Sequence, residues 1–351
     1  MYKRPKCLGY AAYLTGFEAQ KAALRAAAGQ GAPVFVSLHI SEEFSPGYPR
    51  RAAAMCDWLF ENGFTILADV SKKTVVQFGE PDLCALAKTL HLRALRIDYG
   101  FTVPEICSLA AMLPVALNAS TTTAEDAAKI AASGPLVMAM HNFYPRPETG
   151  LDDEFLLQST RSLQAAGVRV LGFIPGNSAL RGPIGEGLPT LERHRGLPPC
   201  TAFAELAVQF GLDEIYLGDP GITDAERTRI ERFCRTGVLA LPALLRPGYE
   251  SLYEQVFTCR PDSPAWLVRF QESREYSCFG GAHAPEPAQP RPRGALTMDN
   301  DHYGRYAGEL QLLRRDHPAD VRVNVIGRLA PGCEGLGDCI LRGEKFALVR
   351  E

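Results

Sequence analysis

Eight short apolar segments recur between Leu8 and Asp219, and a helical pattern follows each of them. Their uninterrupted apolarity is typical of parallel strands that are buried on both faces. The intervals between them are long enough for a crossover helix in every case. Eight consecutive strand–helix units predict an α/β fold built on a (β/α)8 barrel, the TIM barrel. The segments are residues 8–14, 34–38, 65–70, 94–98, 114–118, 136–141, 168–174 and 214–219.

Residues at the starts of the expected helices agree with this pattern. Thr122 and Glu125 have the spacing of a capping box, and so do Thr223 and Glu226. Asp152 is placed to cap another helix. The helix that begins after Thr223 would be the eighth and last of the barrel.

The pattern changes after about residue 237. Short apolar segments separated by turns rich in proline and glycine predict a small β-rich second domain. We therefore expect a catalytic barrel over residues 1–236 and a β domain over residues 237–351. Residues 282–294 contain four prolines and are expected to form an exposed loop. The expected strands of the second domain are residues 238–245, 256–257, 265–270, 321–326 and 346–349.

Composition excludes several classes of partner. The chain has 351 residues and a formal net charge of −3, which does not favour binding to nucleic acid or to a membrane surface. No apolar run approaches the roughly 18–20 residues of a membrane span. The basic N-terminus precedes only a short apolar run without a cleavage site, so we interpret that run as a strand rather than a signal peptide. Ten scattered cysteines without a CxxC pair are expected to be free thiols, most of them buried.

Three carboxylates stand at the ends of expected barrel strands, where TIM barrels carry their active sites. They are Asp69, Asp98 and Asp219, and each interrupts an apolar run. Paired carboxylates at a barrel mouth suit general acid–base or nucleophilic chemistry, above all glycoside hydrolysis. The alternative is that some of them cap helices or bind backbone N–H groups of the loops.

The loop after the sixth expected strand has the highest density of polar and ionisable side chains. Residues 141–151 read HNFYPRPETGL, and they present an imidazole, a carboxamide, a phenol, a guanidinium and a carboxylate. The loops after the seventh and eighth strands contain glycines that could let the backbone approach a phosphate. Arg193 and Arg195 lie in the long insertion between those loops, and we expect Arg195 to be solvated.

Two other classes of function remain open at this point. His141 with one of the strand-end aspartates could bind a divalent metal ion, as in a metal-dependent hydrolase or isomerase. The chain has only seven histidines, however, and no HxH or HExxH pair. A non-catalytic protein that binds sugar phosphates is the third possibility, because the fold alone does not fix the function.

Motifs along nearly the whole chain resemble those of the MupG-like 6-phospho-N-acetylmuramidases. The 141–151 segment is the longest and most specific of them. The chain departs from the family pattern in residues 14–18, in residues 39–43 with Glu42 and Glu43, and in the 282–294 segment. The other matching segments are residues 68–71, 95–101, 117–121, 173–176, 181–183, 186–192, 218–220, 299–300 and 303–306.

The resemblance implies an N-terminal TIM barrel joined to a C-terminal cyclophilin-like domain. It also implies a cytoplasmic glycosidase of cell-wall (peptidoglycan) recycling, with no cofactor. Such an enzyme hydrolyses the β-1,4 bond of N-acetylmuramic acid 6-phosphate–N-acetylglucosamine, a phosphorylated amino-sugar disaccharide. Neither the oligomeric state nor the choice between retention and inversion follows from the sequence, because the latter depends on a carboxylate separation.

With this substrate in view, each candidate residue receives an expected role. Asp69 and Asp98 belong to the carboxylate set, with Asp219 or Glu148 as a further member. Residues expected to contact the sugar rings are Asn118, His141, Asn142, Tyr144 and Glu186. Arg146 and Arg181 are the candidates for the phosphate or the lactyl carboxylate. Four residues of the second domain either reach the barrel mouth or form a domain interface, namely Asp299, Asn300, Tyr303 and Arg305.

Overall fold

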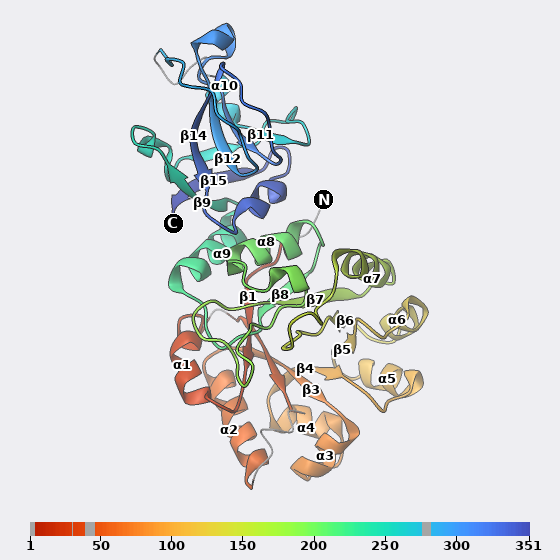
Figure 1. Cartoon of the computed structure of the whole chain (residues 1–351). Helices are drawn as coiled ribbons and strands as arrows, with labels where there is room; N and C mark the ends of the chain where they lie inside the picture. The colour runs from red at the N-terminus through yellow and green to blue at the C-terminus, as the bar shows by residue number, and fades with distance from the viewer. Residues whose placement is uncertain (1–3, 30, 39–45, 276–281) are drawn as a thin grey trace. The chain divides into compact units, whose positions relative to one another are not determined.

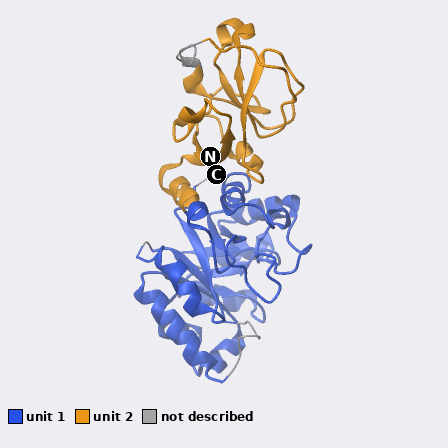
Figure 2. Ribbon diagram, turned by 60° about the vertical axis from the view of Figure 1, so that its left-hand side comes forward, with its two compact units in different colours: residues 1–227 blue, residues 228–351 orange. Residues whose placement is uncertain are grey.

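A computed structural model describes residues 4–29, 31–38, 46–275 and 282–351. It divides into two compact units, Met1–Arg227 and Thr228–Glu351, which are coloured separately in Figure 2. The division falls inside helix α9 (Asp224–Thr236). Each unit is described by itself below.

The first unit is a closed barrel of eight parallel strands, which confirms the predicted fold. The strands follow one another around the barrel in chain order, and β1 pairs with β8 to close it (Figure 1). The predicted segments all contain a strand, and for β3 the bounds agree to the residue. The strands are β1 (Leu8–Ala12), β2 (Pro33–Ser37), β3 (Thr65–Val70), β4 (Leu92–Ile97), β5 (Val115–Asn118), β6 (Val137–Met140), β7 (Arg169–Ile174) and β8 (Glu214–Leu217).

Helices surround the barrel strands (Figure 1). Asp152 caps α7 as predicted, because its side chain accepts a hydrogen bond from the N–H of Phe155. The cap of α6 is Thr123, one residue later than expected, and it accepts from the N–H of Asp126. The helices are α1 (Phe17–Arg25), α2 (Tyr48–Glu61), α3 (Lys72–Phe78), α4 (Leu83–Thr89), α5 (Val103–Ala110), α6 (Ala124–Ala131), α7 (Asp153–Ala165), α8 (Pro199–Val208) and α9.

The interior of the barrel is filled by alternate residues of the strands. Leu67, Ala94, Met140 and Phe173 belong to one buried cluster, with Phe35 packed edge-on to Phe173. Because side chains alternate between the two faces of a strand, the residues two positions further along continue on the inner face. The barrel mouth is therefore built from the inner-face residues that follow this apolar layer.

The second unit is one sheet of seven strands, in the order β10-β15-β9-β14-β12-β13-β11. Phe257, Phe270 and Phe346 pack against one another in its core, with ring centroids 4.7–5.9 Å apart. The sequence did not predict β12 or β13. The strands are β9 (Leu239–Leu245), β10 (Val256–Thr258), β11 (Leu267–Arg269), β12 (Ala295–Asp299), β13 (Leu310–Leu313), β14 (Val323–Leu329) and β15 (Lys345–Arg350), with the helix α10 (Gln271–Glu275) after β11.

Nine of the ten cysteines lie within the described residues and are free thiols, six of them buried. Cys278 lies outside the described residues. Over the same part of the chain, no helix combines the length and apolarity that crossing a membrane requires.

Candidate active site

Two carboxylates and a guanidinium meet on the inner face of the barrel, where β3 and β4 end. Nη1 of Arg96 lies 2.8 Å from Oδ1 of Asp69 and 3.4 Å from Oδ1 of Asp98. Asp69 and Arg96 are register partners on adjacent strands. Parallel pairing therefore brings together two of the three carboxylates that the sequence singled out.

Arg96 is the centre of this arrangement, and it is 4% exposed. Its second terminal nitrogen, Nη2, donates to Oδ1 of Asn142, 2.6 Å away, at the start of the loop after β6. The side chain of Asp69 is 11% exposed and that of Asp98 is 28% exposed. A buried cation needs such partners, because removing it from water is costly. The set of Arg96, Asp69, Asp98 and Asn142 is called the Arg96 cluster below.

Asn118 ends β5 and is half-buried. Its Oδ1 accepts a hydrogen bond from the N–H of Ser120, which is an Asx turn, and its amide NH2 forms none with the described residues. The expected contact with a sugar hydroxyl stays a prediction for Asn118. The same is true of Asn142, whose oxygen is already held by Arg96.

The expectation that Asp219 acts in catalysis is wrong for this geometry. Asp219 is 0% exposed, and its carboxylate accepts hydrogen bonds from the N–H groups of Gly176, Arg181 and Leu188 at 2.8–2.9 Å. Burial raises its pKa, and the three backbone hydrogen bonds act in the opposite direction. Asp219 therefore organises the loop after β7, which is the structural alternative that the sequence left open.

The same contacts fill the place expected for a phosphate. Barrels often bind phosphate through N–H groups of the loops after strands seven and eight. Here the carboxylate of Asp219 already accepts from three N–H groups of the first of these loops. These three N–H groups are therefore not available to a phosphate.

The expected role of His141 as a sugar ligand is also wrong for this structure. His141 follows Met140, an inner-face residue, and so lies on the outer face of the barrel; it is 0% exposed. Its Nε2 lies 3.3 Å from the hydroxyl of Thr160 on α7. Burial lowers its pKa to about 4. His141 is thus a neutral residue between the barrel and helix α7.

A pair of residues that the sequence did not identify fixes the loops after β6 and β7. Glu192 accepts from the N–H groups of Glu148 and Gly150 through its two oxygens. Arg195 donates to both oxygens of Glu192 and to the carbonyl oxygens of Tyr144 and Gly187. The hydrogen bond from Arg195 helps to lower the pKa of Glu192 to about 2. The expectation that Arg195 is solvated was therefore wrong.

Two arginines on these loops are left without such partners. Arg146 is exposed, and the guanidinium of Arg181 lies 4.3 Å above the ring of Tyr13. Neither guanidinium forms an ion pair with a carboxylate of the described residues. By contrast, Arg193 is bound to Asp153 and Glu205. Arg146 and Arg181 are therefore available to bind an anion.

The remaining loop candidates are Tyr144, Glu148 and Glu186. Tyr144 is half-buried, and Glu148 and Glu186 are exposed. Glu148 adopts a φ of 68°, and its backbone N–H is held by Glu192. No contact between the Glu148 carboxylate and the Arg96 cluster is present among the described residues. Glu42 and Glu43 lie outside the described residues.

The four candidates of the second unit belong to its own polar networks. Burial and the neighbouring Glu309 raise the pKa of Asp299 to about 7. Asn300 is 0% exposed and donates to the carbonyl oxygen of Val321 and to Oδ1 of Asn324. Tyr303 is half-buried, and exposed Arg305 donates to the hydroxyl of Tyr306.

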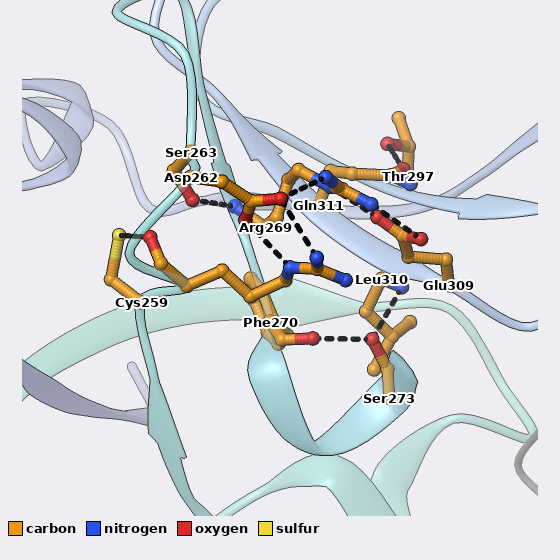
Figure 3. A network of polar contacts seen from close by, with 11 residues as sticks. Cys259, Asp262, Ser263, Arg269, Phe270, Ser273, Thr297, Glu309, Leu310 and Gln311 are labelled. Atoms are coloured by element: carbon orange, nitrogen blue, oxygen red, sulfur yellow. Dashed lines mark hydrogen bonds and ion pairs between the residues drawn. The ribbon is translucent and has the colours of Figure 1, made fainter. Parts of the chain in front are cut away.

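Figure 3 shows the side chains around Glu309 in this unit. Arg269 of β11 donates to both oxygens of Glu309 and also to Asp262. Thr297 of β12 donates to Gln311 of β13, its register partner. These contacts tie β11, β12 and β13 together, so they explain the buried polar residues on this side of the sheet.

Comparison with known proteins identifies the family. Family models described as the N-terminal and C-terminal parts of 6-phospho-N-acetylmuramidase match residues 8–232 and 243–349. This chain belongs to the 6-phospho-N-acetylmuramidase family. It is therefore a glycosidase, as predicted from the sequence. A comparison with curated proteins found no match.

Two solved structures have the same fold over the full chain. A conserved protein of unknown function from Enterococcus faecalis is 30% identical, with a TM-score of 0.83, over 98% of this chain and 96% of that one. An uncharacterized protein from B. cereus is 22% identical, with a TM-score of 0.79, over 99% of this chain and 100% of that one.

Within the described residues, no group of three or more His, Cys, Asp or Glu side chains is placed to hold a metal ion.

Replacing Asp219 by alanine should destabilise the barrel. Three N–H groups lose their acceptor, which should lower the free energy of unfolding by about 3 kcal/mol or more. Urea unfolding followed by the fluorescence of Trp58, in a Trp266→Phe background, measures this change. Exposed Asp57 provides the control, Asp57→Ala, which should unfold like the parent. An inactive Asp219→Ala protein of unchanged stability would restore Asp219 to the catalytic set.

Replacing His141 should flatten the dependence of stability on pH. The folded-state pKa of His141 is lowered to about 4, so the unfolded chain binds the proton first as pH falls below about 6.5. His141 therefore costs about 2 kcal/mol of stability between pH 7 and pH 5. In urea unfolding at both pH values, His141→Gln should lose that much less than the parent. His302→Gln, at an exposed position, should behave like the parent.

Proposed function

We propose that this protein hydrolyses the β-1,4 bond of N-acetylmuramic acid 6-phosphate–N-acetylglucosamine. The observation that carries the proposal is the pair Asp69 and Asp98, joined by Arg96 at the inner face of the barrel of a 6-phospho-N-acetylmuramidase family member. Two carboxyl groups on opposite sides of a glycosidic bond supply the proton and the second carboxylate that this hydrolysis needs.

The phosphorylated substrate is supported by the arginines of the rim. Arg146 and Arg181 lie on the loops after β6 and β7 and form no ion pair with a described carboxylate. A guanidinium binds a phosphate or a carboxylate through two parallel hydrogen bonds. N-acetylmuramic acid 6-phosphate carries both groups, on its 6-phosphate and its lactyl ether. Asn118, Asn142 and Tyr144 are the proposed contacts of the sugar hydroxyls and the N-acetyl group.

Arg146 and Arg181 differ from the neighbouring Arg193 and Arg195, which are paired with Glu205 and Glu192. Both pairs neutralise their own charge inside the protein. The loops are held rigid by Asp219 and Arg195, so that Arg146 and Arg181 present their charge to the solvent from a fixed backbone. We infer that the products enter the recycling of cell-wall sugars inside the cell.

The first experiment compares two substrates after chelator treatment of the pure protein. The phosphorylated disaccharide should be cleaved into its two sugars, and the unphosphorylated disaccharide should be cleaved far more slowly. Mass spectrometry of the products over time gives the ratio. Loss of cleavage on chelation, restored by a divalent ion, would contradict the proposed metal-independent chemistry. Bound but intact substrate would indicate a binding protein instead.

Replacing Asp98 by asparagine should preserve the fold and reduce kcat by about 100-fold or more, because a general acid or nucleophile contributes at least that much. Asp57→Asn serves as the control at an exposed position and should keep the parental rate. Product release is followed by mass spectrometry, and the fold by circular dichroism. A parental rate for Asp98→Asn would remove Asp98 from the mechanism.

Replacing Arg146 or Arg181 by methionine should weaken the preference for phosphate. The ratio of kcat/KM for the phosphorylated over the unphosphorylated disaccharide should fall about 10-fold or more, since a charged hydrogen bond is worth about 1.5–3 kcal/mol. Arg161, exposed on α7, gives the matched control Arg161→Met. If the ratio is unchanged in both variants, the phosphate is recognised elsewhere.

A further inference from the structure

We propose that Arg96 holds Asp69 and Asp98 at the separation of a retaining glycosidase, so that the sugar is released with its anomeric configuration retained. The inference rests on the proposed function, and it adds a positioning residue and a stereochemical outcome to it.

Arg96 limits the distance between the two carboxylates. One nitrogen, Nη1 of Arg96, lies 2.8 Å from Oδ1 of Asp69 and 3.4 Å from Oδ1 of Asp98. The two oxygens are therefore at most about 6 Å apart, whereas the carboxyl groups of retaining and inverting glycosidases lie about 5–5.5 Å and 6.5–9.5 Å apart. An inverting enzyme needs the longer separation to place a water molecule between one carboxylate and the sugar. The separation that Arg96 allows between these two oxygens is shorter than the range of an inverting enzyme.

The position of Arg96 is itself fixed by the barrel. Its backbone lies in β4, in register with Asp69 of β3, and its side chain is almost fully buried. Its other terminal nitrogen is held by Asn142, which comes from a third part of the chain. A guanidinium is planar, so two bound ends determine its orientation. Arg96 therefore sets the spacing of the two carboxylates rather than following it.

The unequal contacts separate the two carboxylates by role. Asp69 has the shorter contact to Arg96 and the less exposed side chain, so it is the more firmly fixed of the two carboxylates. Asp98 has the longer contact to Arg96 and the more exposed side chain, so it is the more accessible of the two to water and to a leaving group. We assign Asp69 as the nucleophile and Asp98 as the acid and base.

Hydrolysis then proceeds in two steps through a covalent intermediate. Asp69 attacks the anomeric carbon and forms a glycosyl ester while the bond to the leaving oxygen breaks and that oxygen takes the proton of Asp98. In the second step Asp98 takes a proton from water, the resulting oxygen attacks the anomeric carbon, and the bond to Asp69 breaks. Each step inverts the centre once, so the product has the configuration of the substrate.

Proton NMR of the first product formed by the wild-type protein tests the stereochemistry. Cleavage of the disaccharide tests the proposed function, and the anomer released tests this inference separately. The β anomer of N-acetylmuramic acid 6-phosphate should appear first and mutarotate later. Initial release of the α anomer would overturn the inference while leaving the proposed function intact.

Variants of Arg96 test its positioning role. Arg96→Lys and Arg96→Met should lower kcat by about 10-fold or more with a smaller change in KM, because the bound geometry and not substrate affinity is lost. The acidic limb of the pH–rate profile should move to higher pH, since a carboxylate without its cation binds a proton more readily. Arg93→Met, at an exposed position of the same strand, should keep the parental profile. If the Arg96 variants fold and turn over slowly but keep the parental pH–rate profile, Arg96 has a purely structural role.

Azide rescue tests the two carboxylate roles with an activated β-glycoside of the same sugar. Asp69→Ala with azide should give the α-glycosyl azide, because azide then attacks from the face left by the nucleophile. Asp98→Ala with azide should give the β-glycosyl azide, formed from the ester on Asp69. Exchange of these two products would overturn the assignment of roles.

Discussion

The alternation of side chains along the barrel strands is the constraint on which the site depends. A residue on a strand of a closed barrel faces either the interior or the surrounding helices, and its neighbour faces the other way. Leu67, Ala94 and Met140 face the interior, so Asp69, Arg96 and Asn142 do as well. The apolar layer below holds these polar groups at one level. The packing of the apolar core thus determines where the polar side chains of the barrel mouth lie.

The same constraint explains which polar residues are absent from the mouth. His141 follows the inner-face residue Met140 and so faces outward, and both His141 and Asp219 are fully buried. Each acquires a structural partner there: Thr160 for His141, and three backbone N–H groups for Asp219. Their work is to hold α7 and the loop after β7 in place. Polar residues that the sequence alone does not distinguish therefore fall into two groups, those at the barrel mouth and those that support the surrounding structure.

Much of the fold could be predicted from the sequence, because a buried parallel strand shows itself as a local apolar run. The strands β12 and β13 could not, since β12 buries the polar residues Thr297 and Asp299, which interrupt the apolar run that marks a buried strand. Strand ends likewise pointed to Asp69 and Asp98. Counting alternate residues along each strand would also have placed His141 on the outer face. The role of Arg195, which depends on carbonyl groups up to 51 residues away, has no local signal.

The buried charge at the centre of the barrel mouth is itself an argument for function. A buried ion pair seldom stabilises a fold more than apolar residues of the same size would, because the desolvation of each ion is costly. Arg96 is nevertheless 4% exposed and shares one nitrogen between two carboxylates. Stability alone would favour an apolar residue at this position, as at Ala94 two residues earlier on the same face. The arrangement is accounted for if the barrel gives up some stability in order to hold two carboxylates within about 6 Å of each other.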